Sequence, residues 1–345
     1  MQDIQELNLE EIQAFVLSKG EAAFRAKQIE EWLWKKNVPD FASMSNLSAK
    51  LRTQLIQSFS FYKLQIADEQ ISRDKSSKFA LQLSDGQHIE MVIIPAKQRV
   101  TVCISSQVGC PLACSFCATA AMGFVRNLYA YEIYQQVSMA HRLAQERYNA
   151  RLSNIVIMGM GEPLLNFENV AKAVKLISSS QGLEMSPSRI TLSSAGIPDE
   201  IKRLADSQLN IQLAISLHSA DPKKRRALMP IAKTHPLQEL SQAVQYYHQK
   251  TQQRITLEYL LLDGVNDSTK DAEKLAVFCR AFPVKINLIE YNSNAFAIYR
   301  KSSEERLADF VACLEAKNML VQVRQSRGKD IDAACGQLVK MITIS

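Results

Sequence analysis

The sequence has 345 residues, 47% of them hydrophobic, and its 41 lysines and arginines exceed its 35 acids to give a net charge of +6. This length fits two domains, or one large core with appendages, and no apolar run approaches the roughly 18 residues that a membrane span needs. The segment 1–11 is rich in acids and amides, unlike a signal or transit peptide, so we expect a cytoplasmic protein without a membrane partner. The small positive net charge fits an RNA-binding protein and an ordinary soluble protein equally well.

Helices are predicted for residues 1–60. Within them, the segment Glu21–Lys36 mixes apolar side chains such as Ile29 and Leu33 with lysines and arginines, and it ends before Pro39. Basic residues on a helical surface can contact RNA phosphates. We therefore expect an N-terminal helical RNA-binding extension over residues 1–60.

A small β linker is predicted for residues 61–97. Two strand-like runs, 79–83 and 89–94, flank Asp85–Gly86, a pair that is typical of a hairpin turn. Pro95 is expected to close the second strand, because proline cannot donate a backbone hydrogen bond.

From residue 98 onward, strand-like runs alternate with helix-length segments. The predicted strands are Val100–Ser105, Ile155–Met158, Arg189–Ser193, Ile211–Ser216, Ile255–Leu262, Lys285–Glu290 and Leu320–Arg324. The predicted helices are Ala130–Tyr148, Val170–Ser179, Leu237–Gln249, Ala272–Phe282 and Ser303–Lys317. This alternation predicts an α/β fold over residues 98–345, a partial (β/α) barrel whose working groups lie at the carboxyl ends of its strands.

The chain has seven cysteines, and four of them crowd into the segment 103–117. Cys110, Cys114 and Cys117 have the C-x3-C-x2-C spacing, with which three thiolates in one loop can bind three irons of a [4Fe–4S] cluster. The fourth iron is then open to an outside donor, which in the radical SAM superfamily is S-adenosylmethionine. A structural zinc site is the alternative, but zinc needs a fourth ligand, and the local candidate, Cys103, lies on a predicted strand.

Six residues that could bind a ligand fall at or just after the ends of predicted strands. Glycine lets the backbone approach a ligand, a glutamate can receive an ammonium group, and serine, histidine and asparagine can bind ribose and carboxylate groups. Taken singly, each also has a simpler interpretation as a turn, capping or structural residue. These residues are Gly161, Glu162, Ser193, Ser216, His218 and Asn292.

Other cysteines and basic residues have two interpretations each. Cys335 lies between small residues and is either an accessible nucleophile or a buried thiol. Cys279 and Cys313 fall within amphipathic segments and are interpreted as core cysteines. Basic residues near the predicted barrel mouth either contact RNA phosphates or form a solvated surface; they are Lys223–Arg226, Arg324, Arg327 and Lys329.

The order of these motifs resembles that of a known family. Nearly end to end, the chain is similar to the RlmN/Cfr family of radical SAM RNA methyltransferases. The segments that carry the resemblance are Phe24–Ile29, Val102–Cys110, Cys117–Thr119, Gly123–Phe124, Arg126–Leu128, Gly159–Asn166, Leu228–Ile231, Val265–Asp267 and Asp330–Leu338.

The resemblance implies a role for each candidate residue. The cysteine triad would bind the cluster, and the six strand-end residues would contact S-adenosylmethionine. Cys335 would carry the methyl group, Glu90 would accept the C2 proton of adenine, and Cys103 would release the methylated RNA by forming a disulfide with Cys335. The expected substrates are 23S rRNA at the peptidyl transferase centre and tRNA at the adenosine 3′ of the anticodon. An electron donor such as flavodoxin, a thiol reductant and a monomeric enzyme are also expected.

The methylated carbon is predicted from one position. Pro163 follows Gly161 and Glu162, where Cfr has alanine, and this favours C2 of adenine over C8. Ser194 and Ser293 stand where relatives often have threonine and proline, and these differences concern cofactor contacts rather than the class of reaction. Two alternatives remain: C8 methylation, and a non-catalytic RNA-binding protein with a structural metal.

Overall fold

The computed structural model describes residues 1–97 and 99–338. Residues 98 and 339–345, the two ends of the predicted catalytic segment 98–345, lie outside the described residues. The sheet strands, in spatial order, are β1 (Gln65–Ile71), β2 (Ser77–Gln82), β3 (His88–Ala96), β4 (Arg99–Ile104), β7 (Leu152–Ile157), β8 (Ile190–Ser194), β9 (Gln212–Ser216), β10 (Ile255–Leu261), β11 (Val284–Glu290) and β12 (Val321–Arg324).

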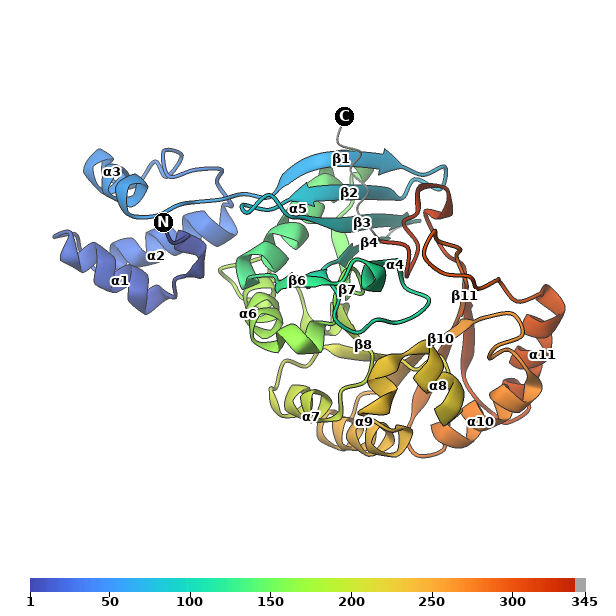
Figure 1. Cartoon of the computed structure of the whole chain (residues 1–345). Helices are drawn as coiled ribbons and strands as arrows, with labels where there is room; N and C mark the ends of the chain where they lie inside the picture. The colour runs from blue at the N-terminus through green and yellow to red at the C-terminus, as the bar shows by residue number, and fades with distance from the viewer. Residues whose placement is uncertain (98, 339–345) are drawn as a thin grey trace.

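Helices follow most of the parallel strands and cover the outside of the sheet (Figure 1). They are α5 (Ala130–Tyr148), α6 (Phe167–Ser178), α7 (Pro198–Asp206), α8 (Pro222–Leu228), α9 (Leu237–Thr251), α10 (Thr269–Cys279) and α11 (Glu304–Glu315). The short helix α4 (Ala118–Ala121) instead follows Cys117 directly. Strands β4 and β7 to β12 pair in parallel, as the alternation of elements predicts. The predicted α/β barrel is therefore confirmed. Two short helices, α7 and α8, begin at prolines and were not predicted.

The predicted hairpin is present and extends the same sheet. β1, β2 and β3 run antiparallel, and β3 pairs antiparallel with β4, so the segment 61–97 continues the barrel sheet at its edge. β3 also runs through Pro95 to Ala96, so the prediction that Pro95 ends the strand was wrong. Beyond Ile93 this strand pairs with β4 alone, and the missing N–H of Pro95 therefore costs no bond to β2.

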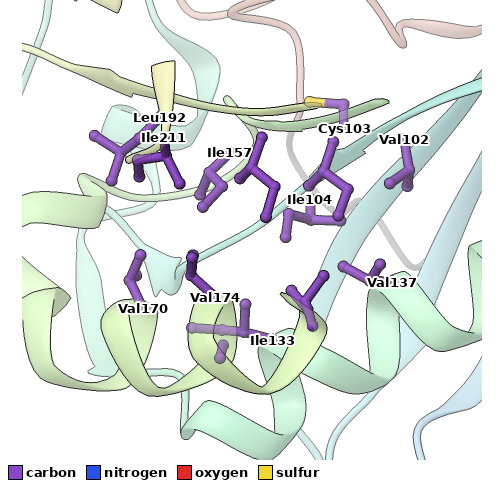
Figure 2. Close-up of a cluster of buried hydrophobic side chains, with 14 of the residues drawn as sticks. Val102, Cys103, Ile104, Ile133, Val137, Ile157, Val170, Val174, Leu192 and Ile211 are labelled. Carbon is purple, nitrogen blue, oxygen red and sulfur yellow. The ribbon is translucent and has the colours of Figure 1, made fainter. Parts of the chain in front are cut away.

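The alternation of side chains along β4 explains why Cys103 faces the barrel interior. Figure 2 shows Val102 and Ile104 of β4 directed toward α5 and α6, where they meet side chains such as Ile133 and Val174. Successive side chains of a strand point to opposite faces. Cys103 therefore lies on the other face of β4, away from these helices (Figure 2).

The N-terminal residues form a helical unit beside the sheet (Figure 1). Its helices are α1 (Leu9–Ser18), α2 (Phe24–Glu30) and α3 (Ala49–Ser58), and a single π-helical turn continues α2 over Glu31–Lys35. Ile29 and Leu33 are buried, and the Tyr134 hydroxyl of α5 donates to the carbonyl of Trp34 at 2.7 Å. The apolar face of the basic segment thus packs inward and leaves its polar face outside. Within residues 1–97 and 99–338, no helix is long and apolar enough to cross a membrane.

Candidate active site

A cavity of about 160 Å³ opens at the carboxyl ends of the parallel strands. It collects residues that are far apart in the sequence, and most of the predicted ligand-binding residues line it. The predicted residues in its wall are Cys110, Cys114, Cys117, Gly161, Glu162, Ser193, Ser216, His218 and Cys335. Cys103, Glu90 and Asn292 are not in this wall.

The cysteine loop is held in place by backbone hydrogen bonds. The loop connects two short antiparallel strands, β5 (Gln107–Gly109) before it and β6 (Phe124–Asn127) after it. At its start, Cys110 N–H donates to the Gly123 carbonyl at 2.9 Å. Gly109 has a φ of +72°, and a side chain there would collide with the Gly123 carbonyl oxygen. At the far end of the loop, Ala118 N–H donates to the carbonyl of Gly336 at 2.9 Å, which joins the loop to the Cys335 segment.

The three thiols of this loop lie in apolar surroundings. Burial raises the pKa of Cys110 to about 12 and also raises that of Cys114. Such thiols ionise when a metal replaces the proton. No three Cys, His, Asp or Glu side chains of residues 1–97 and 99–338 converge on one ion, whereas each thiolate of a cluster binds a different iron. The donor set and its placement in one cavity wall fit an iron–sulfur cluster.

Glu162 is buried in the cavity wall at the end of β7. Its carboxylate accepts hydrogen bonds from the backbone N–H of Ala195 at 2.7 Å and of Leu164 at 3.1 Å. Burial raises the pKa of Glu162 to about 7, and the hydrogen bonds limit that rise. No lysine or arginine is within ion-pair distance of it in the described part of the chain. A ligand ammonium group would supply the missing positive charge.

Three further predicted residues lie on neighbouring strands of the cavity. The hydroxyls of Ser193 on β8 and Ser216 on β9 are 3.3 Å apart. His218 is buried, its Nδ1 accepts from Leu260 N–H at 3.0 Å, and its ring meets Phe116 edge to face with centroids 4.7 Å apart. Burial lowers the pKa of His218 to about 3, so the ring is neutral at physiological pH and acts as a hydrogen-bonding group rather than a cation.

A second, smaller cavity of about 90 Å³ contains Cys103, Arg324 and Cys335 in its wall. Burial raises the pKa of Cys103 to about 12. Although residue Cys335 is exposed, protein atoms of the two cavity walls desolvate its thiol and raise its pKa, whereas the guanidinium of Arg324 lowers it. Cys335 is exposed to solvent and lines both cavities. It is the only cysteine of the described residues that does so.

Glu90 and Asn292 lie near these cavities without lining them. Glu90 is buried on β3, and its carboxylate is 3.6 Å from Nζ of Lys78, which contacts the carbonyl of Asp332 at 3.5 Å in the Cys335 segment. Asn292 is also buried, and its side-chain amide donates to the Ser326 hydroxyl at 2.9 Å. The same amide nitrogen donates to the Glu290 carbonyl at 3.2 Å, so these bonds engage the nitrogen of Asn292 and not its side-chain oxygen.

The sequence analysis missed two polar residues in the first cavity. Glu258 on β10 and Tyr291 after β11 line it, and the buried Tyr291 hydroxyl has no hydrogen-bond partner among the described residues. Oε2 of Glu258 is 3.6 Å from Nη1 of Arg324, so these two side chains form an ion pair at the cavity. The available signal was a glutamate within the apolar strand Ile255–Leu261. Buried polar atoms without partners mark a place where a bound ligand supplies them.

The predicted core cysteines differ in burial. Cys279 on α10 is buried, as predicted, and burial raises its pKa to about 12. Cys313 on α11 is only half-buried, and its thiol contacts the carbonyl of Thr269. The basic residues at the start of α8, 223–226, also differ in burial. Arg225 is fully buried, so the interpretation of this residue as a phosphate contact was wrong.

Comparison with known proteins gives consistent matches over the whole chain. Residues 104–276 match the model of the radical SAM superfamily, and residues 2–60 match that of the ribosomal RNA large subunit methyltransferase N-terminal domain. The chain is 46% identical to "Probable dual-specificity RNA methyltransferase RlmN" of Cytophaga hutchinsonii, covering 97% of this chain and 92% of that protein. It is 40% identical to "Dual-specificity RNA methyltransferase RlmN" of Campylobacter hominis, covering 98% and 97%.

A solved structure agrees with these sequence matches. The fold superimposes on a radical SAM methyltransferase from Sphaerobacter thermophilus with a TM-score of 0.92 and 39% identity, covering 98% of this chain and 99% of that chain. The hydrogenase maturase HydG, at 11% identity and a TM-score of 0.52, shares the fold alone. On the shared sequence, the shared fold and the cysteine loop at the mouth of the barrel, the chain belongs to the RlmN family of the radical SAM superfamily.

Proposed function

We propose that this protein methylates C2 of an adenosine in 23S rRNA, at the peptidyl transferase centre, and of the adenosine 3′ of the anticodon in tRNA, through an S-methylcysteine formed on Cys335. One observation carries the proposal: the Cys335 thiol lines both the cavity of the cysteine triad and the cavity of Cys103. A methyl carrier needs access to a cofactor on one side and to a second thiol on the other. The names of the relatives, which are dual-specificity RNA methyltransferases, support the substrate class.

As a radical SAM enzyme, the protein uses a [4Fe–4S] cluster and S-adenosylmethionine. When bound, these supply the methyl group and the radical that removes a hydrogen from it. Cys110, Cys114 and Cys117 would hold the cluster, and Glu162 would bind the cofactor's ammonium group. Ser193, Ser216 and His218 line the same cavity and would bind its ribose and carboxylate groups, together with the backbone at Gly161. The assignment of Asn292 depends on the resemblance alone.

The remaining steps involve the chain's own side chains. The Cys335 thiolate accepts the methyl group, and the methyl carbon is then joined to C2 of the adenine. Glu90 takes the C2 proton; its contact with Lys78, which also reaches the Cys335 segment, supports that role. Once the adduct has also lost its unpaired electron, the Cys103 thiolate attacks the sulfur of Cys335. The bond between that sulfur and the methylene carbon breaks, the carbon keeps the electron pair and takes up a proton to become the methyl group, and methylated RNA leaves. A Cys103–Cys335 disulfide remains, and a thiol reductant reopens it.

The partners follow from the same scheme. An electron donor such as flavodoxin would reduce the cluster, and the enzyme would act as a monomer in the cytoplasm, where its RNA substrates are. The helical unit 1–60 would add contacts to RNA phosphates, because its exposed lysines face away from the core. Substitution of Lys27 and Lys50 by alanine should weaken RNA binding and reduce its salt dependence, as measured by filter binding. Unchanged salt dependence would remove these two residues from the RNA contact.

The decisive experiment is anaerobic reconstitution with iron and sulfide, followed by incubation with rRNA fragments and tRNA and mass spectrometry of the nucleosides. We expect 2-methyladenosine; 8-methyladenosine would favour the C8 alternative, and a preparation that holds zinc without sulfide would favour the non-catalytic one.

Two cysteine variants test the covalent step. Cys103→Ala should accumulate RNA bound to Cys335, because the resolving thiol is missing. Cys279→Ala removes a buried cysteine outside both cavities and should release methylated RNA normally. Normal release of methylated RNA by Cys103→Ala would refute the proposed role of Cys103.

A further inference from the structure

Arg225 on α8 is the largest fully buried side chain of the described residues. Its Nη2 donates to the carbonyl of Ala195 at 2.7 Å, and its Nε donates to that of Leu217 at 3.3 Å. The third nitrogen, Nη1, is buried and has no hydrogen-bond partner in the described part of the chain. Within residues 1–97 and 99–338, Arg225 forms no ion pair, whereas the neighbouring Lys224 pairs with Asp271 at 2.7 Å.

A buried arginine without an anion is energetically unfavourable. Burial lowers the pKa of Arg225 only to about 10, so the guanidinium remains charged at physiological pH. Two carbonyl dipoles provide partial compensation, and a buried charge otherwise requires a partner of opposite sign. The fold therefore needs a negative charge near Arg225 that the carboxylates of residues 1–97 and 99–338 do not supply.

The geometry places the cysteine loop beside this charge. α8 ends at Leu228, whose carbonyl accepts from the backbone N–H of Ser115 at 3.0 Å, within the loop. Ala195, which binds the guanidinium, lines the cavity of the cysteine triad. Gly196, the residue after Ala195, has a φ of +94°, and a β-carbon there would collide with the Leu240 side chain at 2.8 Å and touch Nη2 of Arg225 at 3.4 Å, so the guanidinium lies directly behind this part of the cavity wall. The positive charge of Arg225 favours the ionised form of the nearby Cys114 thiol.

We propose that Arg225 is the buried counter-charge of the iron–sulfur cluster bound by Cys110, Cys114 and Cys117, and that it raises the reduction potential of the cluster. This inference rests on the proposed assignment of the three cysteines. Three thiolates make the site anionic, and reduction adds a further negative charge; a fixed cation behind the wall stabilises the reduced form more than the oxidised form. In return, the cluster supplies the anion that Arg225 lacks.

Redox titration of the reconstituted protein, followed by electron paramagnetic resonance, tests this inference. Arg225→Met removes the charge and fills the same space with an apolar side chain. Arg225→Gln is a second neutral variant, and it keeps a hydrogen-bond donor for the Ala195 carbonyl. Both should lower the equilibrium constant for reduction by at least about tenfold, which corresponds to 59 mV for one electron. Arg225→Lys should remain close to wild type. The matched control is Arg226→Met on the exposed face of the same helix, which should leave the potential unchanged.

Thermal unfolding with and without the cluster separates electrostatics from structural support. A purely structural role for the hydrogen bonds to Ala195 and Leu217 would lower the unfolding temperature equally in both forms. A counter-charge predicts that the cluster raises the unfolding temperature less in Arg225→Met than in wild type, because the variant has no buried cation to neutralise.

The outcomes distinguish the two proposals. Equal potentials in wild type, Arg225→Met and Arg225→Gln, all with full iron and sulfide content, would overturn the role of Arg225 alone. A wild-type protein that binds no iron–sulfur cluster would overturn the assignment of the three cysteines instead.

Discussion

Replacing Gly161 by alanine should weaken both the fold and cofactor binding. Gly161 has a φ of +101°, and an added β-carbon would lie 2.5 Å from Cβ and 2.9 Å from the backbone nitrogen of Gln107. Gly86, in the hairpin between β2 and β3, offers a matched control. Its φ is +80°, and a β-carbon there meets nothing within 4 Å. Both alanine variants therefore strain the backbone, but only Gly161→Ala forces a neighbour to move.

The structure gives the size of the difference. A positive φ costs an alanine about 1–2 kcal/mol, which is the whole expected loss for Gly86→Ala. In Gly161→Ala, Gln107 must also shift; its side chain accepts from Glu162 N–H at 2.8 Å and donates to Asn127 at 2.8 Å. Each of these hydrogen bonds stabilises the fold by about 1 kcal/mol. We expect a loss of about 3–4 kcal/mol in the free energy of unfolding for Gly161→Ala.

Two assays measure this effect. Urea denaturation gives the free energy of unfolding of both variants, and calorimetric titration of the reconstituted proteins gives their affinity for S-adenosylmethionine. Since the displaced Gln107 holds the backbone of Glu162, the affinity of Gly161→Ala should fall by at least about tenfold, equivalent to 1.4 kcal/mol. Gly86→Ala should bind normally. Equal stability losses in the two variants, with unchanged cofactor affinity, would refute this reasoning.

Further predictions concern the charged groups around the two cavities. Arg324→Met should slow alkylation of Cys335 at a fixed pH near neutrality, because it removes the cation that lowers the pKa of that thiol; peptide mass spectrometry would measure the rate, and an unchanged rate would contradict the contact. Affinity for S-adenosylmethionine should rise between about pH 6 and about pH 8, because Glu162, with a pKa of about 7, becomes a carboxylate in this range and attracts the ammonium group; titration calorimetry should find no such rise in Glu162→Gln. Away from the cavities, Glu132→Gln should lower the free energy of unfolding by about 1.5–3 kcal/mol, because Glu132 is fully buried and binds both terminal nitrogens of Arg126, at 2.8 and 2.9 Å, while Arg126 keeps its ion pair with Asp85; a loss below about 1 kcal/mol in urea denaturation would argue against this pair.

The sequence alone was sufficient for the order of the longer barrel elements and for most of the first cavity. Strands and helices of the barrel were predictable because the hydrophobic periodicity is local, and the prediction for α5, Ala130–Tyr148, agrees residue for residue. The cysteine triad occupies a single loop, so its members had to lie together. The predicted residues Glu162, Ser193 and Ser216 meet because the carboxyl ends of parallel strands meet at one edge of a sheet.

Only the tertiary structure decided which side chains pair across the interior. Nothing in the sequence places Lys78 against Glu90, or Arg324 against Glu258, because these contacts depend on which strands become neighbours and on the direction of each side chain. The basic run on α8 reads as one solvated surface, yet the helix turns Arg225 inward and leaves Arg226 outside. Local spacing determines which residues share one face of a helix or strand, but not which other elements pack against that face. Burial is therefore a property of the packed chain, and it sets both the energetic cost of a charge and the reactivity of a thiol.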